Sequence, residues 1–139
     1  MKSFVLDASV SLAWFLDDPV PDLAVRVRRS LASGSSALVP SLWHLEMANG
    51  FVIAERRGVL AASVADRCLD EVENLLASVV DNSSVTISAR QAHAAARAFS
   101  LTAYDAVYLE TARREHLPLA TLDRVLALAA KRAGVALLS

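Results

Sequence analysis

Short apolar runs alternate with longer stretches of helical periodicity along the chain, and this alternation limits the possible folds more than any other feature. The runs at residues 4–6, 37–39 and 117–122 have the length and composition of buried strands. Between them, apolar residues recur three and four positions apart, which is typical of helices. Strands that alternate with helices favour a parallel sheet covered on both faces. We therefore expect an α/β fold in the form of a three-layer sandwich.

The same patterns give the expected order of elements. Helices are predicted up to residue 16, then over 22–33, 41–57, 63–78, 88–100 and 102–115, with a last one ending at 132. Further short strands are predicted at 85–87 and 135–138. Glycines at 34, 58 and 134 mark natural ends of elements. No repeat, low-complexity tract or linker divides the 139 residues, so we expect one domain over 1–139.

Composition excludes several classes of protein. Apolar residues make up 55% of the chain, too many for disorder, and the surplus favours burial against a second chain. No uncharged stretch is long enough to span a bilayer and no signal peptide is evident. The single cysteine, Cys68, has no partner for a disulfide within the chain, which fits the reducing cytoplasm. We therefore expect a cytoplasmic protein without a membrane segment.

The net charge of −1 gives no reason by itself to expect nucleic acid. Twelve of the fourteen basic residues are nevertheless arginine, and the arginine fork binds phosphate in a bidentate manner. Paired arginines also occur on ordinary solvated helix faces, so the charge pattern leaves both interpretations open.

Two aspartates directly follow predicted strands. Asp7 comes after the first strand and Asp123 after the strand at 117–122. In open parallel sheets, ligands bind beyond the carboxyl ends of the strands, where the strand order reverses. If these two strands are neighbours, both carboxylates face one pocket. The alternative is that each aspartate only caps the helix that follows it.

Two further acids lie on predicted helices. Glu46 lies on a largely apolar stripe with Leu42, Gly50 and Ile53, and a buried carboxylate must be neutralised, paired or bound to a cation. The alternative is a salt bridge to an arginine from elsewhere in the chain. Asp105 lies in a mostly apolar run, and its spacing from Thr102 also resembles a capping box.

Taken together, these four acids predict a metal site better than four separate structural roles do. Oxygen ligands select hard cations such as Mg²⁺ or Mn²⁺. His44, His93 and His116 are scattered, which argues against zinc. We call Asp7, Glu46, Asp105 and Asp123 the acidic cluster.

The residues around these acids resemble the PIN domain, and most closely the VapC-type toxins of bacterial toxin–antitoxin pairs. The resemblance spans nearly the whole chain, in the right order, through the segments Val5-Leu6-Asp7-Ala8-Ser9, Glu46-Met47-Ala48-Asn49, Tyr104-Asp105-Ala106-Val107-Tyr108-Leu109 and Leu119-Ala120-Thr121-Leu122-Asp123. It implies a Mg²⁺- or Mn²⁺-dependent endoribonuclease that cleaves RNA, forms a homodimer and is held inactive by a cognate antitoxin.

The resemblance also implies roles for individual residues. Asp7 and Asp105 correspond to the principal metal ligands, and Glu46 and Asp123 complete the catalytic set. Ser9 and Thr121 match small hydroxyl positions that line the same pocket, although lone hydroxyl residues also serve as caps. Two other residues are candidates from their positions alone: Asn49 to orient Glu46, and Arg124 to hold the RNA backbone or to lie on the helix surface.

Other functions remain open at this stage. A phosphoacceptor receiver domain also gathers aspartates at strand ends, but it needs a nearby lysine, and neither Lys2 nor Lys131 ends a central strand. A PIN nuclease of RNA processing without an antitoxin and a non-catalytic PIN-like binding module both fit the pattern. Trp14 and Phe15 could line an apolar groove for a partner helix or belong to the core.

Overall fold

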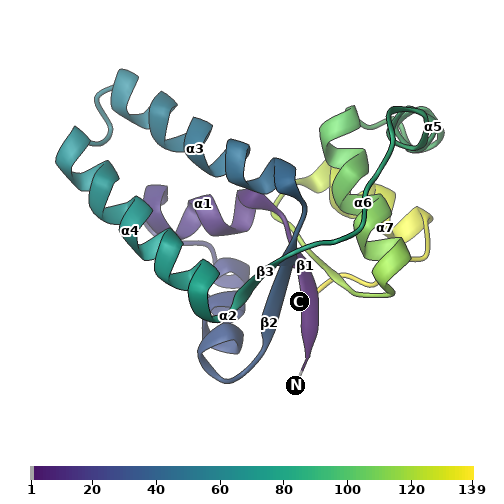
Figure 1. Cartoon of the computed structure of the whole chain (residues 1–139), viewed down its shortest axis with the longest axis horizontal. Coiled ribbons are helices and arrows are strands. Elements are labelled where there is room, and N and C mark those ends of the chain that lie inside the picture. The colour runs from purple at the N-terminus through teal and green to yellow at the C-terminus, as the bar shows by residue number, and fades with distance from the viewer. Residues whose placement is uncertain (1) are drawn as a thin grey trace.

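The computed structural model describes residues 2–139 (Figure 1). Helices and strands alternate along this part of the chain, in the order β1 (Ser3–Leu6), α1 (Ala8–Leu16), α2 (Asp22–Ala32), β2 (Ser36–Val39), α3 (Ser41–Arg56), α4 (Ala62–Ser78), β3 (Val80–Asn82), α5 (Ala89–Phe99), α6 (Ala103–Glu115), β4 (Leu119–Ala120) and α7 (Arg124–Arg132).

The strands form a parallel sheet in the order β3-β2-β1-β4. Its central strand, β1, pairs with β2 through Val5 and Leu38 and with β4 through Leu6 and Ala120. Such strands are buried on both faces, which is why they are continuous apolar runs in the sequence. The predicted α/β class is confirmed.

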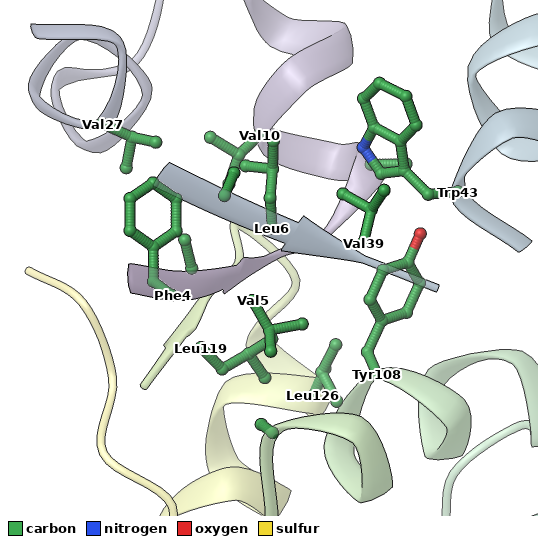
Figure 2. Close-up of a cluster of buried hydrophobic side chains, with 14 of the residues drawn as sticks. Phe4, Val5, Leu6, Val10, Val27, Val39, Trp43, Tyr108, Leu119 and Leu126 are labelled. Carbon is green, nitrogen blue, oxygen red and sulfur yellow. The ribbon is translucent and has the colours of Figure 1, made fainter. Parts of the chain in front are cut away.

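Side chains of β1 alternate between the two faces of the sheet, and helices cover each face (Figure 2). Phe4 and Leu6 point toward Val10 of α1 and Val27 of α2, whereas Val5 lies on the opposite face with Leu126 of α7. All six side chains are at most 1% exposed. The predicted three-layer arrangement is therefore confirmed, with its core on both sides of the sheet.

The prediction of a strand at 85–87 was wrong. The third strand is β3, where Val80 pairs with Ala37 and Asn82 pairs with Val39. Asp81 and Asn82 are exposed because β3 is an edge strand, so only Val80 carries the apolar signal of a buried strand. Residues 85–87 follow the sheet as a loop.

Of the two strands predicted near the C-terminus, one is shorter than expected and the other is not formed. The run at 117–122 contributes only Leu119–Ala120 to the sheet as β4. The segment at 135–138 is not a strand, and it meets β4 in an isolated parallel bridge between Leu119 and Leu137. Two backbone hydrogen bonds make this contact, from Leu119 N–H to Ala136 O at 2.9 Å and from Leu138 N–H to Leu119 O at 2.9 Å.

Close packing of α1 against α3 fixes how the long helix α3 meets the sheet. A Cβ atom at Gly50 would lie only 2.5 Å from a methyl carbon of Leu12, so glycine lets the two helices approach. Trp43 Nε1 donates to the buried Ser11 Oγ at 3.0 Å and locks the same interface at the other end. Within residues 2–139, no helix is long and apolar enough to cross a membrane.

Candidate active site

The strand order reverses direction beside β1, and this point places two of the predicted acids. The chain runs from β1 to β2 to β3 on one side and then returns to β4 on the other side of β1. Asp7 follows β1 and Asp123 lies three residues beyond the end of β4. The backbone N–H of Asp7 donates to Ala120 O at 3.0 Å. Both aspartates therefore lie at the switch point where open parallel sheets bind ligands.

Two hydroxyl groups hold the Asp7 carboxylate. Ser9 Oγ donates to Asp7 Oδ2 at 2.6 Å, and Thr121 Oγ1 donates to the same oxygen at 2.7 Å. Although Asp7 occupies the N-cap position of α1, its side chain makes no capping hydrogen bond. It is only 5% exposed. The capping alternative therefore does not explain Asp7, whose carboxylate is fixed by side chains from two separate segments.

The same hydroxyls also position the segment that carries Asp123. Ser9 Oγ accepts from Leu122 N–H at 3.0 Å, and Thr121 Oγ1 accepts from Asp123 N–H at 3.0 Å. Asp123 Oδ1 accepts from the backbone N–H groups of Val125 and Leu126 at 2.9 and 3.0 Å. Asp123 therefore caps α7, the alternative role that its position in the sequence suggested. The same hydrogen bonds hold its carboxylate at the switch point.

Glu46 lies on α3 and reaches across to α6. Tyr108 Oη donates to Glu46 Oε1 at 2.6 Å. Tyr108 is fully buried, so core packing holds its ring and its hydroxyl in place. Figure 2 shows this side chain. This hydrogen bond joins α3 to α6 and holds one oxygen of Glu46 in place.

Asp105 lies in the first turn of α6, three residues before Tyr108. Thr102 is the N-cap of this helix, and its Oγ1 accepts from Asp105 N–H at 3.2 Å. The local capping contact predicted from the sequence is therefore present. It leaves the Asp105 carboxylate at the start of a helix that begins at the switch-point edge.

Electrostatics show that the acidic cluster gathers in one place. Burial raises the pKa of Asp7, opposed by the Ser9 and Thr121 hydrogen bonds, and the charge of Asp123 raises it further. Burial also raises the pKa of Glu46, and the charges of Asp7 and Asp105 add to this effect against the Tyr108 hydrogen bond. Burial raises the pKa of Asp105, with further contributions from Asp123 and Asp7. These charge effects connect Asp7, Asp105 and Asp123 with one another, and they connect Glu46 with Asp7 and Asp105.

No positive side chain neutralises this cluster in the part of the chain that the structure describes. The ion pairs there join Arg28 to Glu71 and Arg113 to Glu110, and neither includes an acid of the cluster. The alternative in which an arginine pairs with Glu46 is therefore not found over residues 2–139. Partly buried carboxylates that repel one another and lack a cationic partner are stabilised when a cation binds between them.

The donor set fits a hard divalent cation, because it consists of carboxylate and hydroxyl oxygens. Among residues 2–139, no three acidic, histidine or cysteine side chains are placed so that together they could hold a metal ion. The arrangement is an open group of neighbouring carboxylates, of which Asp7 is held most firmly and Glu46 has one oxygen engaged by Tyr108. Magnesium commonly binds through one or two carboxylates and keeps several waters, so an open group suits it.

The structure changes the expected roles of residues around the cluster. Tyr108, and not Asn49, donates a hydrogen bond to Glu46, while the Asn49 side chain is exposed. Sequence reasoning missed this contact, although Tyr108 lies three positions after Asp105 and therefore on the same side of α6.

Arg124 is exposed and lies directly after Asp123, so it remains a candidate for contact with the RNA backbone.

Thr121→Val tests the hydroxyl support of Asp7. Valine keeps the shape but removes the donor to Asp7 and the acceptor for Asp123 N–H. Loss of groups that orient metal ligands typically costs about 10- to 100-fold in metal affinity or activity, and we expect a loss in this range with the fold retained. Metal titration and RNA cleavage, beside a circular dichroism spectrum, measure it. Unchanged affinity and activity would show that the hydroxyl does not support the site.

Comparisons with known proteins agree with this architecture. The family model of the PIN domain matches residues 4–132. Two similar solved structures are PAE2754 from Pyrobaculum aerophilum, with 20% identity, a TM-score of 0.67 and 96% of each chain covered, and FitAcB from Neisseria gonorrhoeae, with 19% identity, a TM-score of 0.68 and coverage of 98% of this chain and 96% of that one.

A third similar structure is a domain of a functionally unknown protein from Methanocaldococcus jannaschii, with 15% identity, a TM-score of 0.56 and coverage of 100% of this chain and 92% of that one. At these identities the likeness concerns the fold. No curated protein matches the sequence.

Proposed function

Because the chain belongs to the PIN domain family, whose members are generally nucleases, we propose that it is a Mg²⁺- or Mn²⁺-dependent endoribonuclease. The observation that carries the proposal is the acidic cluster itself. Its four carboxylates lie near the switch point of the sheet, burial and neighbouring charges raise the pKa values of three of them, and the described residues provide no ion-pair partner for them.

We assign the metal-holding role to the acidic cluster, Asp7, Glu46, Asp105 and Asp123. A divalent cation bound there would lower the pKa of water and neutralise charge on the phosphate. The chain's own residues prepare the site: Ser9 and Thr121 fix Asp7, and Tyr108 fixes Glu46. Among the described residues, no arginine or lysine forms an ion pair with the cluster, so no side chain competes with the metal for these acids. Exposed Arg124 is the candidate to hold the RNA backbone.

Cleavage of single-stranded RNA by the purified chain tests this function. We expect internal cleavage with Mg²⁺ or Mn²⁺, none in EDTA, and recovery when excess metal is added back. Cleavage that continues undiminished in EDTA would contradict the metal role. Binding of RNA without cleavage under any metal condition would favour the non-catalytic module instead.

We further propose that the nuclease is the cytoplasmic toxin of a toxin–antitoxin pair, held inactive by a cognate antitoxin. The ordered match to VapC-type toxins supports this role over that of an RNA-processing nuclease. Induced expression in a bacterial host should then arrest growth, and Asp7→Asn should relieve the arrest although it is expressed to the same level. Growth unaffected by an active nuclease would favour RNA processing, as would the lack of a neighbouring gene for a short DNA-binding protein.

A homodimer is the proposed assembly, and the apolar surface supports it. Val125 and Leu128 on α7 are 58% and 60% exposed, and Leu45 on α3 is 72% exposed. Trp14 and Phe15, by contrast, pack partly buried against the core. We expect light scattering to give twice the chain mass at tens of micromolar, roughly the range where micromolar affinities saturate. A clean monomer at that concentration would contradict the dimer.

A further inference from the structure

A separate hollow lies on the same edge of the sheet as the acidic cluster, beyond β2 and β3. It has a volume of about 370 Å³. Its walls come from the start of α3, the loop after β3 and the start of α6, and they include Leu42, Ile87, Tyr104 and Val107. We call it the β2–β3 hollow. Its size is at the small end of the range for small-molecule sites, which suits a flat ring and is too small for a partner helix.

The most unusual residue of this wall is Tyr104. It is 64% exposed, and among residues 2–139 it is the one aromatic residue in the set of exposed large hydrophobic residues. Within residues 2–139, its hydroxyl makes no hydrogen bond to another residue. Large exposed aromatic side chains often mark binding sites, because their burial is completed by a ligand.

Two helices, α3 and α6, supply residues both to the wall of the hollow and to the acidic cluster. On α6, Tyr104 directly precedes Asp105, and Val107 directly precedes Tyr108, the partner of Glu46. On α3, Leu42 lies one turn before Glu46. A molecule bound at the cluster therefore has the hollow as its immediate neighbour. Ser41, Ser83 and Thr86 add hydroxyl groups to the wall, which could meet the polar edge of a ring.

We propose that the β2–β3 hollow takes one unstacked base of single-stranded RNA, packed against the ring of Tyr104, next to the phosphate held at the acidic cluster. This inference rests on the proposed function and names its substrate class. Proteins that read single-stranded RNA splay bases out and stack them on aromatic rings. A duplex cannot offer a base face to the hollow, so the site selects single strands.

RNA binding by an inactive protein tests this proposal apart from cleavage. Asp7→Asn serves as the slow-cleaving background, in excess Mg²⁺ and at low salt, with a fluorescently labelled single-stranded oligoribonucleotide read by anisotropy. Tyr104→Ala should weaken binding about 5- to 150-fold, the range that one base–aromatic stack supplies. Tyr104→Phe should stay within about 2-fold, because stacking needs the ring and not the hydroxyl. Val59→Ala is the control: Val59 is 61% exposed and lies outside the hollow, in the turn that follows α3.

An oligomer of the same length without bases completes the test. Tyr104→Ala and the background protein should bind this abasic strand equally, because phosphate contacts are untouched. Equal binding of the normal strand by both would overturn the proposal, as would an equal loss in Tyr104→Ala and Tyr104→Phe. If Tyr104→Ala loses as much on the abasic strand as on the normal one, the ring contacts the backbone and not a base. No RNA binding by any variant would overturn the proposed function itself.

Discussion

Asp7→Asn is expected to reduce RNA cleavage by at least about 100-fold while the fold stays intact. Loss of groups that only orient a metal ligand already costs about 10- to 100-fold, and Asp7 is proposed as a ligand itself. Asparagine has nearly the same shape and can still accept from Ser9 and Thr121. Initial cleavage rates with saturating Mg²⁺ measure the effect, and Asp105→Asn should behave alike.

Asp17→Asn provides the control for this experiment. Asp17 is an exposed aspartate at the end of α1, outside the acidic cluster, so its replacement changes the net charge by the same amount. We expect it to cleave RNA at the wild-type rate. If Asp7→Asn cleaves as fast as Asp17→Asn does, Asp7 has no part in catalysis.

The second large effect concerns stability without metal. Burial and the charge of Asp123 raise the pKa of Asp7 above its ordinary value of 3.8, against the hydroxyl bonds. The folded protein therefore holds this proton more tightly than the unfolded chain. The resulting stabilisation is complete below the ordinary pKa and is lost as the pH rises through the raised one. In EDTA near neutral pH, Asp7→Asn should therefore unfold at the same temperature as wild type or higher.

Magnesium should reverse this order. A ligand that binds only the folded state at about 100 times its dissociation constant adds about 2.7 kcal/mol, or roughly 10 °C for a chain of this size. The melting temperature of wild type should rise by this amount when Mg²⁺ is added, and that of Asp7→Asn should rise much less. Thermal melts of both proteins between acidic and neutral pH, with EDTA and then with Mg²⁺, measure both effects. A wild-type protein that melts well above the mutant in EDTA and ignores Mg²⁺ would make the acids purely structural.

The sequence was sufficient to predict the fold class because its signals are local. Buried parallel strands need continuous apolar residues, and Phe4-Val5-Leu6 meets this need without help from distant parts of the chain. Edge strands carry a weaker signal. In β3 only Val80 is buried, so Val85 and Ile87 gave a stronger apolar pattern although they lie in a loop. The position of that strand depends on pairing with β2, which no local pattern contains.

The acids of the candidate site were predictable for a related reason. Asp7 and Asp123 end apolar runs, and Glu46 interrupts an apolar helix stripe, so each breaks a local pattern. The supporting contacts were not predictable in the same way. Tyr108 reaches Glu46 from 62 positions away in sequence, and Thr121 reaches Asp7 from 114 positions away. Such contacts depend on the strand order β3-β2-β1-β4, which brings the ends of β1 and β4 together.

Manganese binding tests the central claim, that the acidic cluster holds a divalent cation, most directly. Isothermal titration of Mn²⁺ into the wild-type chain, Asp7→Asn and Asp17→Asn compares the site with its charge-matched control at one pH. We expect saturable binding by wild type and Asp17→Asn, and affinity at least about 10-fold weaker for Asp7→Asn, the lower limit for disturbing a metal site. Equal Mn²⁺ affinity in all three proteins, or no binding by wild type, would contradict it.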